Sequence, residues 1–162
     1  MEKRIFFRKA VSEDAELLYQ WRNEEASREN AFDPSEIPWK KHLEWFKSKV
    51  NNPATYIFIL NDAGGSPVGQ VRFDIETAGT AVSHVIIDHK FRQKGYAVEG
   101  LMETCSFLLR ESAVKQILAY IKKCNDISYR TFKKAGFTEI GQTIIKSNDS
   151  YIMRFEKVKA QD

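Results

Sequence analysis

The sequence predicts an α/β (α+β) fold, with one mixed, mostly antiparallel central sheet of about seven strands and four helices on both faces. The apolar patterns follow the order β-α-α-β-β-β-α-β-α-β-β. Three consecutive strands before the third helix can pair antiparallel, whereas the later strand–helix–strand unit needs a parallel crossover. Since the 162 residues contain no linker or repeat, we expect a single domain over 1–162.

The first two elements are a strand and a helix. RIFFRKA (4–10) is typical of a strand. Ser12, followed by two acidic residues, indicates a helix start. The helix runs to about Arg22 and is expected to bury Leu18 and Trp21.

A loop punctuated by two prolines then leads to the second helix and three strands. The second helix carries an apolar stripe, Trp39, Leu43, Phe46 and Val50. TYIFILN (55–61) and PVGQVRFD (67–74) flank the turn DAGGS and predict a hairpin. TAVSHVIID (80–88) predicts the next strand.

The second half of the chain alternates helices and strands. A helix beginning near Tyr96 repeats apolar residues at i, i+3, i+4 and i+7. A strand over 114–121 follows, and Asn125 is expected to cap a short helix that ends at Gly136. FTEIGQTII and SYIMRFEK predict two closing strands.

Composition excludes several function classes. A net charge of +3, from 25 basic and 22 acidic residues, suits an anionic small ligand and favours no nucleic-acid partner. Neither Cys105 nor Cys124 has disulfide-framework or metal-site spacing, and three scattered histidines predict no metal. Without a signal peptide or a long apolar run, we expect a cytoplasmic protein with no membrane partner. The oligomeric state stays open, a homodimer included.

The loop RQKGYA (92–97) points to an anion. A helix starting there directs its unpaired N–H groups and positive dipole end at the loop. Gly95 and Ala97 allow a ligand to approach the backbone, and Arg92 and Lys94 add charge. The loop therefore suits a phosphate or pyrophosphate. A basic helical turn with a cap glycine is the structural alternative.

Two motifs carry a family resemblance over essentially the whole chain. RQKGYA fits [QR]-x-x-G-x-[GA] between a strand and a helix, and NDISYRTFKKAGF fits N-x-x-[AS]-x-x-x-[YF]-x-K-x-GF. The sequence resembles the GNAT acetyl-CoA-dependent N-acetyltransferases. The resemblance implies acetyl-CoA as co-substrate, with its thioester in a gap where two central strands splay apart. It implies cofactor contacts from Val85, Ile86, Ile87, Arg92, Gln93, Lys94, Gly95, Tyr96, Ala97, Asn125 and Phe132.

The chemistry that this resemblance implies needs a proton acceptor for the amine and a proton for the departing thiolate. By its distance from the loop, Ser83 takes the site-facing place, while His84 is one position off unless a bulge rotates it inward. Family members often carry Tyr where this chain has Phe132. We therefore expect Tyr129, with Ser128 second, to protonate the thiolate.

Several polar residues predict an acceptor-binding surface. Gln70, Arg72 and Asp74 share one face of their strand, as a wall for a hydroxylated acceptor or as a solvated surface. Off the core stripe of the second helix lie His42 and Trp45. The remaining candidates are Arg22, Asn23 and Arg28.

A narrower resemblance concerns the acceptor. WRNEEASRE, HLEWF, PVGQVRFD and RQKGYA are similar to segments of the acetyltransferases of pseudaminic and legionaminic acid pathways. This implies acetylation of the 4-amino group of a nucleotide-linked amino-deoxy sugar, by direct attack on the thioester in a ternary complex. The alternatives are a protein N-terminus of the ribosomal-protein type, an aminoglycoside, or a CoA-binding module with weak turnover.

Overall fold

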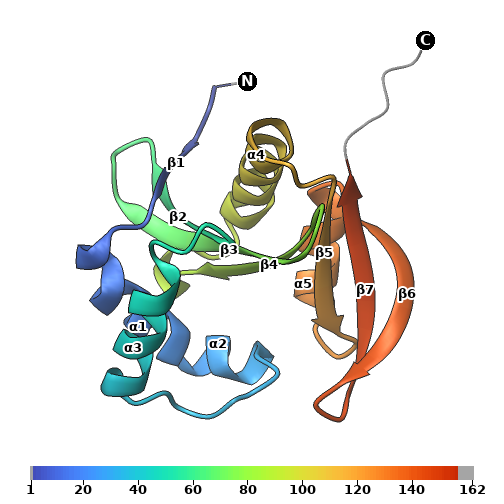
Figure 1. Cartoon of the computed structure of the whole chain (residues 1–162), viewed down its shortest axis with the longest axis horizontal. Helices are drawn as coiled ribbons and strands as arrows, with labels where there is room; N and C mark the ends of the chain where they lie inside the picture. Colours follow the sequence, from blue (N-terminus) through green and yellow to red (C-terminus); the bar gives the residue numbers. More distant parts are fainter. Residues whose placement is uncertain (1, 157–162) are drawn as a thin grey trace.

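Seven strands form one sheet in the order β1-β2-β3-β4-β5-β7-β6, in a computed structural model that describes residues 2–156 (Figure 1). The strands are β1 (Ile5–Lys9), β2 (Thr55–Asp62), β3 (Pro67–Thr77), β4 (Thr80–Ile87), β5 (Gln116–Lys122), β6 (Thr138–Ile145) and β7 (Asn148–Glu156). Neighbours pair antiparallel except β4 and β5, which are parallel. The predicted mixed sheet is confirmed. The expected end of the last strand, at residue 157, lies outside the described residues, as do the ends of the predicted domain.

Five α-helices occur within residues 2–156, one more than predicted. They are α1 (Ala15–Asn23), α2 (Glu25–Asn30), α3 (Trp39–Lys49), α4 (Tyr96–Glu111) and α5 (Asp126–Lys134), with 3₁₀ turns at Ser12–Asp14 and His89–Phe91. Helix α2, with the sequence EASREN, buries none of its residues. It therefore lacks the apolar stripe that reveals a helix in a sequence. None of these helices is long and apolar enough to cross a membrane.

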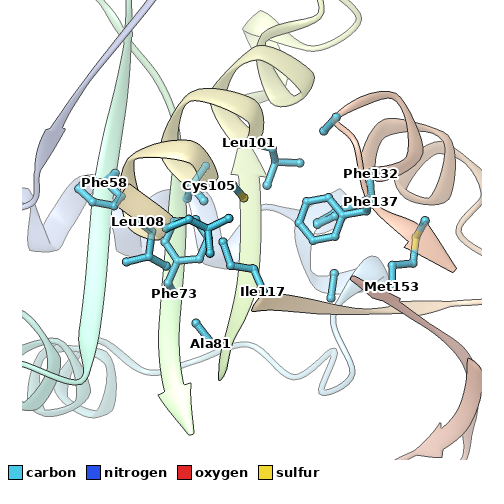
Figure 2. Packing of buried hydrophobic residues seen from close by; sticks show 14 of the residues in the cluster. Phe58, Phe73, Ala81, Leu101, Cys105, Leu108, Ile117, Phe132, Phe137 and Met153 are labelled. Carbon is cyan, nitrogen blue, oxygen red and sulfur yellow. The ribbon is translucent and has the colours of Figure 1, made fainter. Parts of the chain in front are cut away.

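The larger core cluster lies between the sheet and helices α4 and α5 (Figure 2). Leu101, Cys105 and Leu108 of α4 are fully buried against the sheet. A methyl group at Gly100 would lie 2.5 Å from Leu60 of β2, so only glycine allows α4 to approach the sheet this closely. Burial raises the pKa of the Cys105 thiol, which therefore stays protonated within the core.

The opposite face is covered by α1 and α3, which enclose a second, smaller cluster (Figure 1). Leu18, Trp21 and Phe46 are almost fully buried there. Trp39 was expected to join them, but it is 41% exposed and packs edge-on against Tyr19. Pro38 caps α3, and Trp39 therefore occupies the helix end, beyond the second core cluster.

The entry into α1 is held by a carboxylate. Asp14 accepts a hydrogen bond from the Val11 backbone N–H at 2.8 Å and two from the Arg8 guanidinium at 2.8 Å each. The helical turn begins at Ser12, as predicted, but Asp14 supplies the capping oxygen. The hydrogen bonds from Arg8 lower the pKa of Asp14 below its usual value, because their effect is larger than the opposing effect of burial.

Candidate active site

A gap opens between β4 and β5 along half of their length. The parallel ladder contains only three pairs and ends where Val82 meets Leu118, whereas β4 stays paired with β3 as far as Ile87. Alternate backbone groups over residues 83–87 therefore face the gap without a strand partner. Figure 1 shows the two strands diverging. The gap can accept an extended ligand as an additional strand, and it includes the predicted segment Val85–Ile87.

The side chains of this segment are committed to the two cores. Val85 and Ile87 pack against the α4 side, and Ile86 packs against the α1 and α3 side. These three side chains are half-buried in the two clusters, and the backbone groups between them face the gap.

The loop at the end of this strand leads into the N-terminus of α4. Gln93 has a φ of 62° and Gly95 a φ of 80°, and α4 begins at Tyr96 without a side-chain cap. Two left-handed residues in four curl the backbone toward the helix end, where uncapped N–H groups and the dipole attract an anion. The predicted start of the helix is confirmed, and the geometry suits a diphosphate.

This loop is supported by residues that sequence reasoning missed. Arg4 donates a hydrogen bond from Nη1 to the carbonyl of Lys94 at 3.0 Å, and from Nε to Glu99 at 3.1 Å. Glu99 also accepts the backbone N–H groups of Arg4 and Ile5, at 2.9 and 3.1 Å. Because Arg4 and Glu99 are 95 positions apart, no local pattern could reveal this pair.

The side chain of Arg92 points away from the expected anion. It donates from Nε to the Ile87 carbonyl at 3.1 Å and pairs through Nη2 with Glu24 at 3.0 Å. The same nitrogen lies 3.4 Å from the Ser27 hydroxyl. These contacts contradict the prediction that the charge of Arg92 serves the loop. Lys94 is exposed, with its ammonium 5.6 Å from the centre of the Phe91 ring.

A polar wall lies on the sheet face that carries α1 and α3. Arg72 donates to Asp74 at 3.0 Å and lies with its guanidinium 5.0 Å from the centre of the Trp45 ring. Gln70 is 6% exposed, and its Oε1 has no hydrogen-bond partner within the described residues. The predicted common face is confirmed, and it lies under two helices rather than in open solvent.

His84 belongs to this wall. It pairs with Arg72 across β3 and β4 in a continuous register, so the bulge that would rotate it toward the other face is absent from this stretch. Its Nε2 lies 3.5 Å from Asp74, and 46% of the side chain is exposed. The pKa of His84 is lowered chiefly by loss of solvation, and further by the charges of Arg72 and Lys49, whereas the Asp74 carboxylate raises it. The imidazole is therefore neutral at neutral pH.

The two candidates on α3 separate. His42 is 3% exposed and shares a 2.9 Å hydrogen bond with the Ala15 carbonyl. It joins α3 to α1 and is no ligand residue, because the α3 core face is rotated from the predicted stripe. Trp45 is half-buried beside the second cluster and stacks on Arg72. It therefore forms part of the wall.

The candidates on α1 and α2 also differ. Asn23 exchanges two hydrogen bonds with the backbone of Ile37, at 3.0 and 2.9 Å, so it fixes the loop before α3 rather than a ligand. Arg22 donates to the Asp33 carbonyl at 2.9 Å through Nη2. Its buried Nη1 and the buried Nε of Arg28 lack a partner within residues 2–156.

These guanidinium groups influence one another. The pKa of Arg22 is lowered chiefly by burial, with further contributions from the charges of Arg72 and Arg28, whereas Asp33 opposes them. Arg22 and Arg28 thus bring two unsatisfied donors beside Arg72 at the polar wall, which favours an anionic group there.

Comparison with protein families assigns this architecture. The family described as "Acetyltransferase (GNAT) domain" matches residues 4–138. The chain belongs to the GNAT acetyltransferase family. Its members are enzymes that use acetyl-CoA as co-substrate, and the unpaired strand edge and the uncapped N-terminus of α4 suit such a ligand. No curated protein sequence matches the chain significantly.

Solved structures share the GNAT fold over nearly the whole chain. Spermidine N-acetyltransferase from Vibrio cholerae, in complex with CoA and spermine, has a TM-score of 0.85 at 16% identity and covers 98% of both chains. Aminoglycoside acetyltransferase AAC(6′)-Ib, with coenzyme A and kanamycin, has a TM-score of 0.82 at 17% identity and covers 94% of this chain and 95% of its own. A GNAT-family acetyltransferase from Bacillus anthracis has a TM-score of 0.82 at 19% identity and covers 96% of both. The narrower resemblance to sugar-amine enzymes stays a prediction.

The expected proton donor of this GNAT acetyltransferase lies elsewhere. The Tyr129 hydroxyl donates to Glu139 of β6 at 3.0 Å, and its ring packs on Tyr151 of β7. β6 is separated from β4 by β7 and β5. The hydroxyl is therefore separated from the gap by β5 and β7. The hydrogen bond to Glu139 raises the pKa of Tyr129. These contacts contradict the predicted role.

The other residues of the second motif are structural as well. Phe132 is 4% exposed and packs edge-on against Phe137, so it is a core residue rather than a cofactor contact. Asn125 caps α5, as predicted, by accepting the Ser128 N–H at 3.1 Å.

Ser83 of β4 is buried and donates to the Leu118 carbonyl at 3.1 Å, at the point where the gap opens.

Proposed function

We propose that this enzyme transfers acetyl from acetyl-CoA to the primary amine of a small acceptor that also carries an anionic group. The acceptor that fits best is a nucleotide-linked amino-deoxy sugar, acetylated at its 4-amino group. The observation that carries the proposal is the pair of buried, unpaired N–H donors of Arg22 and Arg28, which lie close to Arg72 at the polar wall. Phosphate oxygens satisfy such donors, often two at a time.

Charge argues against a polycationic acceptor. Spermine and kanamycin, bound in the two named neighbours, carry several ammonium groups at neutral pH. Two like charges 4 Å apart repel by about 1 kcal/mol in water and by about 4 kcal/mol at an effective dielectric constant near 20. The charges of Arg22 and Arg28 at the wall would therefore disfavour these compounds and favour a diphosphate.

The cofactor side follows from the gap and the loop. The backbone at Val85–Ile87 would pair with the pantetheine arm, while the amides from Gln93 to Ala97 would hold the diphosphate. The side-chain oxygen of Asn125 caps α5, and its amide nitrogen would donate a hydrogen bond to the same pantetheine arm. No charged side chain of the loop is required, because the helix end supplies the positive potential.

Acetyl-CoA supplies the thioester that a neutral amine attacks directly in the ternary complex. An unpaired N–H of β4 would stabilise the developing oxyanion. His84 lies beside the gap on the face of the acceptor wall. Its lowered pKa keeps the ring neutral but also makes it a weak base, so it would accept the amine proton only transiently, directly or through water. Ser83 projects to the opposite face of β4 and donates to the Leu118 carbonyl, so it would border the gap without contacting this water. The proton removed from the amine would then pass through water to the departing thiolate, so that no net proton is gained or lost.

Two other acceptors and a non-enzymatic role define the alternatives. A peptide N-terminus or an aminoglycoside would use the same gap with different contacts at the wall. A CoA-binding module with weak turnover would bind CoA and release no thiol above hydrolysis with any amine.

A CoA-release assay separates these possibilities. Purified protein is given acetyl-CoA with nucleotide-linked amino sugars, spermidine, kanamycin or N-terminal peptides. We expect the highest kcat/KM with the nucleotide-linked amino sugars. A higher value for spermidine or kanamycin would overturn the anionic acceptor, and a higher value for peptides would support the N-terminal alternative.

An arginine variant then tests the wall itself. Arg28→Ala is expected to raise the acceptor KM by about tenfold or more, with the acetyl-CoA KM within about twofold. Arg130→Ala, at an exposed position on α5, is the matched control and is expected to change neither. Equal KM values in the Arg28→Ala and Arg130→Ala proteins would contradict the assignment.

A further inference from the structure

We propose that Arg92 is a positioning residue that couples the cofactor loop to helix α2 through Glu24. Its guanidinium joins three partners that all lie outside the loop: the Ile87 carbonyl at 3.1 Å, the Glu24 carboxylate at 3.0 Å and the Ser27 hydroxyl at 3.4 Å. The side chain of Glu24 is only 21% exposed. A pair of this geometry and burial holds its two segments together more firmly than an exposed ion pair.

Further contacts join the same two segments. The Trp21 indole N–H donates to Asp88 at 2.9 Å. His89 lies 3.6 Å from the second oxygen of Glu24. Residues 88–92, which lead into the loop, are thus fastened to the junction of α1 and α2 at several points.

Beyond this attachment, helix α2 is held by polar contacts near the surface, from Lys122 to the Glu29 carbonyl at 3.3 Å and from Arg28 to Glu36 at 3.8 Å. It contains six residues and buries none, so it has no hydrophobic anchor of its own. Glu24, its N-cap, has an extended backbone (φ −58°, ψ 137°) that separates α2 from α1. Segments with few buried contacts open at low free energy. The position of α2, and of Arg28 within it, should therefore follow the state of the loop.

The functional consequence is reciprocal coupling. If CoA fixes the loop, Arg92 and Glu24 stabilise α2, and Arg28 is presented to the acceptor in one position. By linkage, the acceptor then strengthens CoA binding by the same factor. The statement about the acceptor rests on the proposed function, whereas coupling between CoA and α2 does not.

Hydrogen exchange with CoA alone tests the coupling. We expect CoA to slow exchange of the amides over 25–30 by about fivefold or more in the wild type. Glu24→Gln is expected to abolish this slowing. Glu111→Gln, which removes an exposed ion pair at the end of α4, is expected to retain it.

Binding measurements distinguish a positioning role from direct phosphate contact. A lysine retains the charge that a phosphate needs, but it cannot reach all three partners of the arginine fork. We therefore expect Arg92→Lys and Glu24→Gln to weaken CoA binding by similar factors, with the double variant no weaker than either single variant. Multiplying effects in the double variant, or Glu24→Gln binding CoA as tightly as wild type, would overturn the proposal.

The outcomes also separate the two proposals. CoA binding without any change in exchange over 25–30 would overturn the coupling and leave the proposed function standing. Failure of CoA to bind to the wild type would overturn both.

Discussion

Gly95 offers a direct test of the diphosphate site, because two substitutions there differ only in charge. Gly95→Asn and Gly95→Asp have nearly the same volume, and both side chains tolerate the left-handed region that Gly95 occupies at φ 80°. A Cβ at this position would lie 3.1 Å from Nη2 of Arg4, which pairs with Glu99, so both variants displace this guanidinium to the same extent. We expect the folding penalty, about 1 kcal/mol, to be shared by both variants.

The difference between them comes from a carboxylate beside the diphosphate. One pair of like charges about 5 Å apart repels by about 1 kcal/mol in water and by about 3 kcal/mol at an effective dielectric constant near 20. The Asp variant should therefore bind CoA between about 5-fold and about 150-fold more weakly than the Asn variant. Added salt should reduce this ratio, since the loop is open to solvent.

Isothermal titration calorimetry with CoA measures this ratio, and thermal unfolding checks that both variants are folded. The matched control is the same pair of substitutions at Gly79, which has a φ of 82° and lies at the opposite end of β4. Gly79→Asn and Gly79→Asp are expected to bind CoA with equal affinity. Equal CoA affinities for folded Gly95→Asn and Gly95→Asp would refute the assignment of the diphosphate to this loop.

Three further predictions concern protons. Tyr129→Phe should leave kcat within about twofold of wild type, because the hydroxyl is bound to Glu139; a loss of tenfold or more, in the general-acid range, would reinstate it as the proton donor. His84→Ala should lower kcat/KM by about 10²-fold, and since the pKa of His84 is lowered, the acidic limb of wild type should lie below pH 6.5; a limb at 6.5 that vanishes in the variant would contradict this. Asp14→Asn should reduce the unfolding free energy by about 1–2 kcal/mol near neutral pH. The depressed pKa of Asp14 means that this contribution is present above the unfolded value of about 3.9 and is lost as pH falls through the folded pKa, so urea denaturation of the two proteins should converge at acid pH.

The elements that the sequence predicted well are those whose signal is local. The hairpin around DAGGS, the amphipathic α4 and the loop at Gly95 each depend on residues within a few positions of one another. α2 shows the limit of this reasoning, because a short helix without buried residues leaves no periodic apolar pattern.

Strand alternation also placed Gln70, Arg72 and Asp74 on one face from sequence alone. That α1 and α3 cover this face, and that His84 joins it, required the register between β3 and β4. A period of two defines which residues share a face but not what lies opposite that face.

The sequence by itself determined the order of the strands and of four of the five helices in residues 2–156, the loop that opens α4, and the motifs that mark a GNAT acetyltransferase. Only the tertiary structure decided where the long side chains point. Arg92 turns to Glu24, Arg4 reaches Lys94, and Tyr129 reaches Glu139. The physical reason is that a long polar side chain takes the conformation in which its donors are satisfied, and the partners that satisfy them are brought together by the sheet from distant parts of the chain.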